Sequence, residues 1–328
     1  MNRNLTIEIV RVTEAAAIAA SKLMGRGDEK AADQAAVDAM RQALNKLTID
    51  GRVVIGEGER DEAPMLYIGE RVGCPPGPKV DIALDPLEGT TITAQGGQNA
   101  LAVVAMADSE GFLHAPDVYM EKIAIGPNLP PNTVDLDRSV EGNLMRLAAA
   151  KDLAIKNLAI CVLNRPRHQA IIEAIRATGA RIYLINDGDV SGVIATTQPD
   201  SGIDMYIGTG GAPEGVLAAA ALQCTGGQMQ GRLIFRNDDE VARARRCGID
   251  DLNRTYLLDE LAHGDIMFSA TGVTPGAMLD GVRYDSLGIK TQSIVMRSQT
   301  KTIRKIETHH CQNESSVSQP EKTAVASV

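Results

Sequence analysis

Regular alternation of apolar and amphipathic segments in the second half of the chain restricts the fold more than any other feature. Short apolar runs rich in Ile, Val and Leu are typical of strands, and the stretches between them have the spacing of amphipathic helices. Strands and helices are predicted to alternate at about 157–163, 166–178, 181–185, 188–196, 203–207, 214–224 and 265–270. This order is typical of a parallel or mixed sheet covered by helices on both faces, so we expect an α/β fold.

The first half of the chain is predicted to contain two helices followed by several strands. The helices are expected at about 7–24 and 31–47, and the strands at about 52–56, 79–84, 100–107 and 123–125. The turn Asp108-Ser109-Glu110-Gly111 is predicted to be a hairpin connection.

The predicted elements suggest two subdomains, residues 1–153 and 154–311, with a soft boundary near 151–156. Strands at the end of the second part are allowed to return to the first sheet. Residues 312–328 are small, polar and without periodicity, so we expect a disordered tail.

Composition excludes several classes of function. The 328 residues carry a net charge of −9, which argues against nucleic acid or an anionic membrane as a partner. No segment reaches transmembrane length and the N-terminal residues lack a signal-peptide core, so a cytoplasmic location is expected. The five Cys residues have no CxxC spacing, which indicates reduced thiols rather than a zinc site or a disulfide framework.

The most informative motif is Asp85-Pro86-Leu87-Glu88-Gly89-Thr90, which follows the apolar run 80–84. Open α/β sheets bind ligands at the C-terminal ends of their strands. Two carboxylates there can hold a hard divalent cation through oxygen, and Gly89 has no Cβ to keep a phosphate from the backbone N–H groups. Because Thr90 can orient a water molecule, the motif suggests metal-assisted hydrolysis of a phosphate ester.

Acidic residues flanked by glycine follow four of the predicted strands. They are Glu57, the pair Asp85 and Glu88, the pair Asp187 and Asp189, and Glu214. The simpler interpretation is that glycine merely begins each turn. If these side chains converge with Asp33 from the second helix, however, each pair of carboxylates about 4 Å apart repels by roughly 4 kcal/mol at an effective dielectric of about 20. Such a cluster needs protons or cations, and oxygen ligands without His or Cys favour Mg²⁺ or Mn²⁺ over zinc.

A grip for a second phosphate is predicted at Arg165-Pro166-Arg167, which follows the strand at 157–163. Two guanidinium groups at a strand end suit a phosphate, although a solvated basic patch is the alternative. The carboxylates of Asp187 and Asp189 could accept hydrogen bonds from sugar hydroxyls. The run Gly208-Thr209-Gly210-Gly211 is predicted to be an anion-binding loop.

These residues and motifs resemble those of the class II fructose-1,6-bisphosphatases of the GlpX type, within a superfamily of metal-dependent, lithium-sensitive phosphatases. The resemblance covers about Leu5 to Ile306. The matching segments are 25–28, 32–33, 54–59, 63–70, 85–90, 115–120, 165–168, 187–190, 210–215 and 268–272. It implies a layered α-β-α-β-α sandwich in which the first subdomain holds the metals and the 1-phosphate, and the second holds the sugar and the 6-phosphate.

The resemblance also implies roles for individual residues. The implied metal ligands are Asp33 and Glu57 for one cation, and Asp85, Glu88 and Glu214 for a second. Gly89 and Thr90 would meet the 1-phosphate next to Glu88, and Thr90, Asp61 and Glu59 would serve catalysis, with Asp61 assisting as a base. The implied 6-phosphate ligands are Tyr119, Arg165 and Arg167, and the implied sugar contacts are Asp187, Gly188, Asp189 and Gly211.

The implied activity is metal-dependent hydrolysis of D-fructose 1,6-bisphosphate to D-fructose 6-phosphate, as in gluconeogenesis or a carbon-fixing cycle. The nearest alternative is a bifunctional enzyme that also hydrolyses sedoheptulose 1,7-bisphosphate. More distant alternatives are an inositol monophosphatase-like enzyme and a non-catalytic sugar-phosphate or Mg²⁺-binding module. A homodimer or homotetramer is expected.

Overall fold

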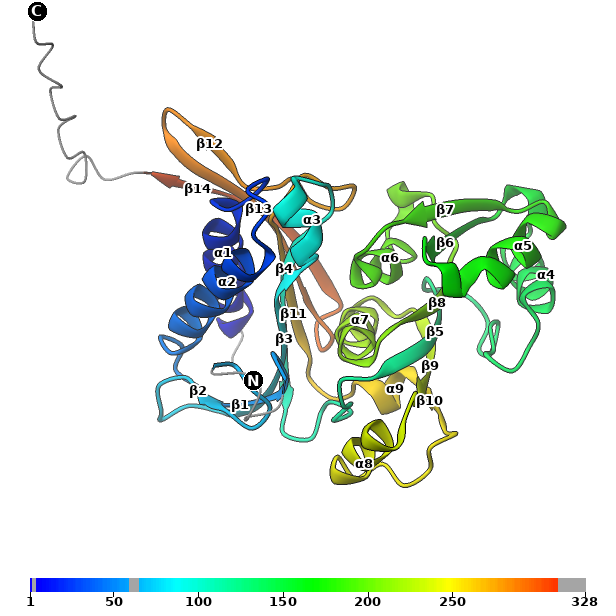
Figure 1. The fold of residues 1–328 in the computed structure, drawn as a ribbon, viewed down its shortest axis with the longest axis horizontal. Helices are drawn as coiled ribbons and strands as arrows, with labels where there is room; N and C mark the ends of the chain where they lie inside the picture. The colour runs from blue at the N-terminus through cyan, green and yellow to red at the C-terminus, as the bar shows by residue number, and fades with distance from the viewer. Residues whose placement is uncertain (2–3, 59–64, 312–328) are drawn as a thin grey trace, which may run out of the picture.

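The computed structural model describes residues 1, 4–58 and 65–311, which form two β-sheets and the helices that cover them. Figure 1 shows five layers in the order helix, sheet, helix, sheet, helix. Both sheets contain parallel and antiparallel pairs. The predicted α/β sandwich of two mixed sheets is therefore confirmed.

The first sheet has eight strands in the order β12-β13-β11-β4-β3-β1-β2, with β14 paired to β13. Its strands are β1 (Asp50–Ile55), β2 (Arg71–Val72), β3 (Lys79–Glu88), β4 (Leu101–Asp108), β11 (Met267–Gly272), β12 (Arg283–Asp285), β13 (Gly288–Arg297) and β14 (Thr302–Cys311). The C-terminal strands enter this sheet through β11, which pairs antiparallel with β4.

The second sheet has six strands in the order β10-β9-β5-β8-β6-β7. They are β5 (Tyr119–Ile125), β6 (Ala159–Leu163), β7 (Arg181–Ile185), β8 (Met205–Gly211), β9 (Gln228–Ile234) and β10 (Thr255–Leu257). The chain therefore crosses from the first sheet to the second between β4 and β5, and returns between β10 and β11. The division at 153/154 remains a prediction about folding units.

Helices α1 (Leu5–Ser21) and α2 (Glu29–Leu44) cover the outer face of the first sheet. Asp28 begins α2 as an N-cap, because its carboxylate accepts a hydrogen bond from the Ala31 N–H at 2.9 Å. The apolar stripe predicted for this helix is buried, and its members are Val37, Met40, Leu44 and Leu47. Burial of that stripe orients α2 on the sheet and so fixes where Asp33 points.

The middle layer contains α6 (Asp189–Ala195) and α7 (Ala212–Thr225). Almost the whole of α7 is apolar and buried, because it lies between two sheets and has no solvent face. The helix ends at Gly226, whose φ of 87° favours glycine. This position places the first turn of α7, with Glu214, between the two sheets.

Of the remaining helices, the first packs against α2 beside the first sheet, and the others cover the outer side of the second sheet or lie at its ends. They are α3 (Thr90–Gln95), α4 (Val140–Lys151), α5 (Gln169–Thr178), α8 (Asp238–Arg246) and α9 (Leu258–Leu261), together with the short 3₁₀ turns Ile155–Asn157, Pro166–His168 and Pro199–Ser201. Helices α4 and α5 pack on the sheet through a separate apolar cluster. Within the described residues no helix is both long and apolar enough to span a membrane.

The predicted hairpin at Asp108–Gly111 is wrong. The turn itself exists, since the Gly111 N–H donates to the Asp108 carbonyl at 2.9 Å. However, the two edges of β4 are already paired with β3 and β11, so the chain leaves the sheet after the turn and enters the other sheet as β5. Local turn chemistry was predicted correctly, but the partner of the following strand was not.

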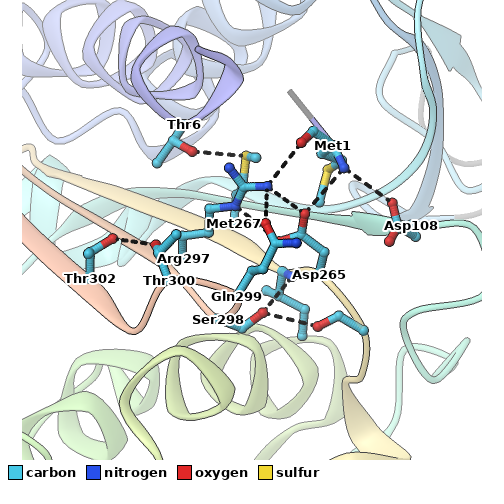
Figure 2. A network of polar contacts seen from close by, with 12 residues as sticks. Met1, Thr6, Asp108, Asp265, Met267, Arg297, Ser298, Gln299, Thr300 and Thr302 are labelled. Carbon is cyan, nitrogen blue, oxygen red and sulfur yellow. Dashed lines mark hydrogen bonds and ion pairs between the residues drawn. The ribbon is translucent and has the colours of Figure 1, made fainter. Parts of the chain in front are cut away.

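Figure 2 shows a polar network that ties the first residue of the chain to the first sheet. The Met1 amine donates to Asp265 Oδ2 at 3.2 Å, and Arg297 Nη2 donates to the same oxygen at 2.7 Å and to the Met1 carbonyl at 2.9 Å. Burial would raise the pKa of Asp265, but the hydrogen bonds from Arg297 and the amine lower it below its usual range. The network therefore holds an ionised carboxylate between two cations, behind α1.

Candidate active site

The central acidic motif lies at a bulge at the end of β3. Pairing with β4 joins Asp85 to Val103 and then Glu88 to Leu101, so three residue steps on β3 face two on β4. The Leu87 N–H donates to Asp85 Oδ1 at 3.0 Å within this irregular segment. The bulge brings both carboxylates into one cavity, which a regular strand with alternating faces would do less readily.

Gly89 follows the bulge with φ of 97°, which places it in the left-handed region. A side chain at this position would be strained, and its Cβ would also lie 3.2 Å from Ile92 Cδ1. The left-handed turn ends the strand and starts α3 at Thr90, so the Thr90 side chain lies at the same cavity as the carboxylates.

The cavity has a volume of about 350 Å³ and is lined by segments that belong to both sheets. Six separate segments contribute acids to it: α2, the segment after β1, the end of β3, the segment before β5, the segment after β7, and the first turn of α7. The acids are Asp33, Glu57, Asp85, Glu88, Asp117, Asp187 and Glu214. The convergence of the predicted metal ligands is thus a property of the structure, although their roles stay predictions.

Burial and mutual repulsion raise the pKa values of these acids. For Glu57 burial is the largest cause, followed by Asp85 and Asp33, and its pKa rises to about 8. Burial likewise raises the pKa of Asp85 to about 6 and that of Glu214 to about 7. Burial also raises the pKa of Glu88 well above its usual range and raises that of Asp33. Several of these groups therefore retain protons near neutral pH unless cations bind.

The geometry of three of the acids fits a metal ion. Carboxylate oxygens of Asp85, Glu88 and Glu214 lie within 4.8 Å of one another. Among the described residues, Glu214 Oε2 and the Tyr206 hydroxyl are the buried side-chain polar atoms that lack a hydrogen-bond partner. An unpartnered buried carboxylate oxygen is costly unless a ligand satisfies it. Because the donors are all oxygen, they suit Mg²⁺ or Mn²⁺ better than zinc.

Gly211 packs against the same carboxylate. A Cβ there would lie 1.8 Å from Glu214 Oε2, so any other residue would displace the Glu214 side chain. The predicted anion-binding loop at 208–211 is wrong, because these residues belong to β8 and pair with β5. Glycine is needed here for close packing of side chains rather than for a loop.

Lys122 is a buried cation next to the site that was not predicted from the sequence. It lies on β5, is fully buried, and its Nζ donates to Asp189 Oδ2 and to the Gly211 carbonyl, the latter at 2.7 Å. Its charge partly opposes the rise in the pKa of Glu214. The signal was its position in the strand, because Lys122 shares the inward face with the buried Met120 and Ala124.

Asp189, the partner of Lys122 in this buried ion pair, lies next to the acidic motif. It is the first residue of α6, and the next N–H, of Val190, donates to Glu88 Oε1 at 3.4 Å. Gly188 precedes it with φ of 84°, and a Cβ at this position would lie 3.2 Å from Ser191 Oγ. The structure therefore places the predicted sugar contact Asp189 behind the cavity, held by Lys122.

The two predicted arginines are held in different ways. Arg167 donates from Nε and Nη2 to the Thr209 carbonyl, at 3.0 and 2.7 Å, and lies 4.9 Å from the centroid of the Tyr119 ring. Arg165 pairs with Asp187, with 3.6 Å between Nη2 and Oδ1. Arg165 and Asp187 also line an adjacent cavity of about 590 Å³ between α3 and β7.

His168 supports Arg167 through the backbone. Its Nδ1 lies 2.7 Å from the Leu163 carbonyl, and its Nε2 lies 2.8 Å from the Thr209 N–H. A carbonyl can only accept and an N–H can only donate, so the ring is neutral with its proton on Nδ1. Burial, the largest cause, lowers its pKa and keeps that form. The fixed ring holds Thr209, whose carbonyl orients Arg167.

The structure thus separates the predicted site residues into two groups. One group lines the cavity and consists of Asp33, Glu57, Asp85, Glu88, Gly89, Thr90, Asp187 and Glu214. The other group, Tyr119, Arg165 and Arg167, lies beside the cavity and does not line it. The two groups lie next to each other because Tyr119 on β5 pairs with Gly211 on β8, and Gly211 packs against Glu214 of the cavity. The predicted catalytic acids Glu59 and Asp61 lie outside the described residues.

The fold is a layered α/β sandwich, and its cavity is lined by carboxylates and lies next to the basic cluster of Arg165 and Arg167. This combination is that of a phosphatase that can bind metal ions. The family model described as bacterial fructose-1,6-bisphosphatase, glpX-encoded, matches residues 3–310. The chain belongs to this family.

Curated relatives agree with this assignment. The chain is 46% identical over 324 residues to fructose-1,6-bisphosphatase 1 class 2 of Escherichia coli strain K12, covering 94% of this chain and 96% of the relative. It is 43% identical over 335 residues to D-fructose 1,6-bisphosphatase class 2/sedoheptulose 1,7-bisphosphatase of Trichodesmium erythraeum strain IMS101, covering 94% of this chain and 97% of the relative. The resemblance stated from the sequence is confirmed.

Proposed function

We propose that this protein hydrolyses D-fructose 1,6-bisphosphate to D-fructose 6-phosphate and inorganic phosphate. The observation that carries the proposal is the gathering of acids from six segments around one cavity with Gly89 and Thr90, beside the arginines at Tyr119. Family membership supports the same reaction. It argues against the inositol monophosphatase-like and non-catalytic alternatives.

The acids are proposed to hold divalent cations, Mn²⁺ or Mg²⁺. Asp33 and Glu57 would hold one, and Asp85, Glu88 and Glu214 a second. When bound, the cations supply neutralisation of the phosphoryl oxygens and a lowered pKa for a water ligand. The chain's own contribution is to keep these carboxylates together despite their repulsion, through burial between the sheets and the charge of Lys122.

The reacting phosphate is proposed to sit at Gly89 and Thr90. The Thr90 hydroxyl would orient the attacking water, Asp61 would accept its proton, and Glu59 is proposed to serve catalysis as well. The water oxygen would form a bond to phosphorus while the bond from phosphorus to the sugar oxygen breaks, and that oxygen would take up a proton from solvent to become a hydroxyl, while the proton on Asp61 returns to solvent. Alignment of these groups before the reaction lowers the barrier through orientation.

The rest of the substrate is proposed to extend toward the basic cluster. Tyr119, Arg165 and Arg167 would hold the 6-phosphate, and the sugar contacts would be Asp187, Gly188, Asp189 and Gly211. The pairing of Tyr119 with Gly211 supports this direction, because it places the two groups side by side. A cytoplasmic homodimer or homotetramer, serving gluconeogenesis or a carbon-fixing cycle, completes the proposal.

A bifunctional enzyme remains the second candidate, because one relative is named for both fructose 1,6- and sedoheptulose 1,7-bisphosphate. Release of phosphate from a panel of sugar bisphosphates and monophosphates, with Mn²⁺ and with a chelator, tests both functions. The proposal predicts metal-dependent release from fructose 1,6-bisphosphate. Release confined to sedoheptulose 1,7-bisphosphate or to monophosphates would refute it.

A further inference from the structure

Arg236 lies against the same aromatic ring as Arg167. Its guanidinium carbon is 4.8 Å from the centroid of the Tyr119 ring, and that of Arg167 is 4.9 Å away. Arg236 follows β9, which pairs with β5 so that Ile234 lies opposite Tyr119. Arg236, which follows β9, and Arg167, which follows β6 and is held by Thr209 of β8, therefore bring two cations to one ring.

A buried carboxylate holds Arg236 in place. Glu240, in the first turn of α8, accepts hydrogen bonds from the Arg236 N–H and Nε, both at 2.7 Å. The Glu240 side chain is only 1% exposed, whereas that of Arg236 is 55% exposed. The guanidinium is thus oriented from inside the protein while one side remains open to solvent and ligands.

The charges around this ring leave room for an anion. Glu240 neutralises Arg236, but Arg167 is held by a carbonyl and forms no ion pair with a carboxylate among the described residues. Both guanidinium groups keep N–H donors beyond those used by Glu240 and Thr209. Two forks of donors and a tyrosine hydroxyl form a set that matches the several acceptor oxygens of a phosphate dianion.

We propose that Arg236 is a specificity-determining residue that binds the distal phosphate of a sugar bisphosphate together with Arg167 and Tyr119. The inference rests on the proposed function and extends it. Because Tyr119 lies two residues from Asp117, which lines the metal-binding cavity, the ring is within reach of a substrate that spans the two groups. Arg236 then favours bisphosphates over substrates that carry only the reacting phosphate.

The test compares three ligands of the full chain with Mn²⁺: fructose 1,6-bisphosphate, fructose 1-phosphate and the product fructose 6-phosphate as an inhibitor. For Arg236→Met we expect kcat/KM for the bisphosphate to fall about 10- to 100-fold, mainly through KM, because a charge-assisted contact is lost. The inhibition constant of fructose 6-phosphate should rise by a similar factor. The rate with fructose 1-phosphate should not change, and Arg236→Lys should restore part of the loss.

Arg254 provides a matched control. It lies 5.0 Å from the centroid of the Tyr256 ring and pairs with Glu260, away from the cavity. Arg254→Met should leave all three constants as in the wild type. Equal losses with fructose 1,6-bisphosphate and fructose 1-phosphate, or an unchanged inhibition constant for fructose 6-phosphate, would overturn the inference. A wild-type protein inactive on fructose 1,6-bisphosphate would instead refute the proposed function.

Discussion

Replacing Glu214 with glutamine should stabilise the metal-free protein while weakening its response to metal. The Glu214 carboxylate lies among like charges, and its Oε2 is buried without a hydrogen-bond partner in the described structure. Glutamine has nearly the same volume but no charge. The substitution therefore removes the repulsion between Glu214 and the neighbouring carboxylates. A bound cation would offset this repulsion in the wild type.

The size of the effect follows from the pKa. Burial, the largest cause, raises the pKa of Glu214 from 4.5 to about 7. The folded state therefore binds the proton more tightly than the unfolded chain, and stability falls as the pH rises from about 4.5 through about 7. Since one pKa unit corresponds to about 1.4 kcal/mol, the ionised carboxylate costs about 3 kcal/mol above pH 7.

Thermal unfolding in the presence of a chelator measures this cost. At an unfolding entropy of about 2.1 cal/mol/K per residue, 3 kcal/mol corresponds to a rise in Tm of about 4 °C for Glu214→Gln at pH 8. At pH 4.5 the difference should nearly vanish, because the wild-type side chain is then protonated in the folded state. Adding Mn²⁺ should raise the Tm of the wild type more than that of the variant, which keeps only the cation site proposed at Asp33 and Glu57.

Glu240→Gln serves as the control with the opposite sign. Hydrogen bonds from Arg236 lower the pKa of Glu240, so its charge stabilises the fold and the variant should lose stability at pH 8. If Glu214→Gln lowers the Tm of the chelated protein at pH 8 as well, Glu214 is not in a repulsive cluster and the reasoning fails.

Three further substitutions test other parts of the site. Thr90→Ala should lower kcat by at least about 100-fold with little change in Tm. Replacing its exposed neighbour, Thr91→Ala, should leave kcat unchanged. Equal kcat values for the two variants would contradict the role of Thr90. Lys122→Met should lower Tm by several degrees and weaken Mn²⁺ binding, because it leaves Asp189 buried without its cation. An unchanged Tm in calorimetry would contradict this. His168→Phe should raise KM for the bisphosphate with kcat nearly unchanged; an unaltered KM would separate Arg167 from His168.

Features of the fold that depend on local periodicity could be predicted from the sequence. The stripe from Val37 to Leu47 and the alternation after residue 157 require only the spacing of apolar residues, and the helices and strands lie close to their expected positions. The proximity of Glu57 and Asp85 could also be anticipated, since they follow parallel neighbouring strands of one sheet, whereas Asp33 comes from a helix and Glu214 from the other sheet.

Features that depend on tertiary pairing could not. The turn at Asp108–Gly111 reads as a hairpin, and only the occupied edges of β4 exclude it. The bulge at Asp85–Glu88 arises from pairing with β4, and nothing local reveals it. The contact of Arg236 with Tyr119 joins segments more than a hundred residues apart, so no spacing in the sequence could indicate it.

The most direct measurement is a titration of Mn²⁺ into chelator-treated protein while phosphate release from fructose 1,6-bisphosphate is followed. The account predicts negligible release without metal, saturable recovery in the wild type, and no recovery in Glu214→Gln at the same concentrations. Full activity of the chelated wild type, or full recovery of Glu214→Gln, would contradict the claim that the gathered carboxylates act by holding divalent cations.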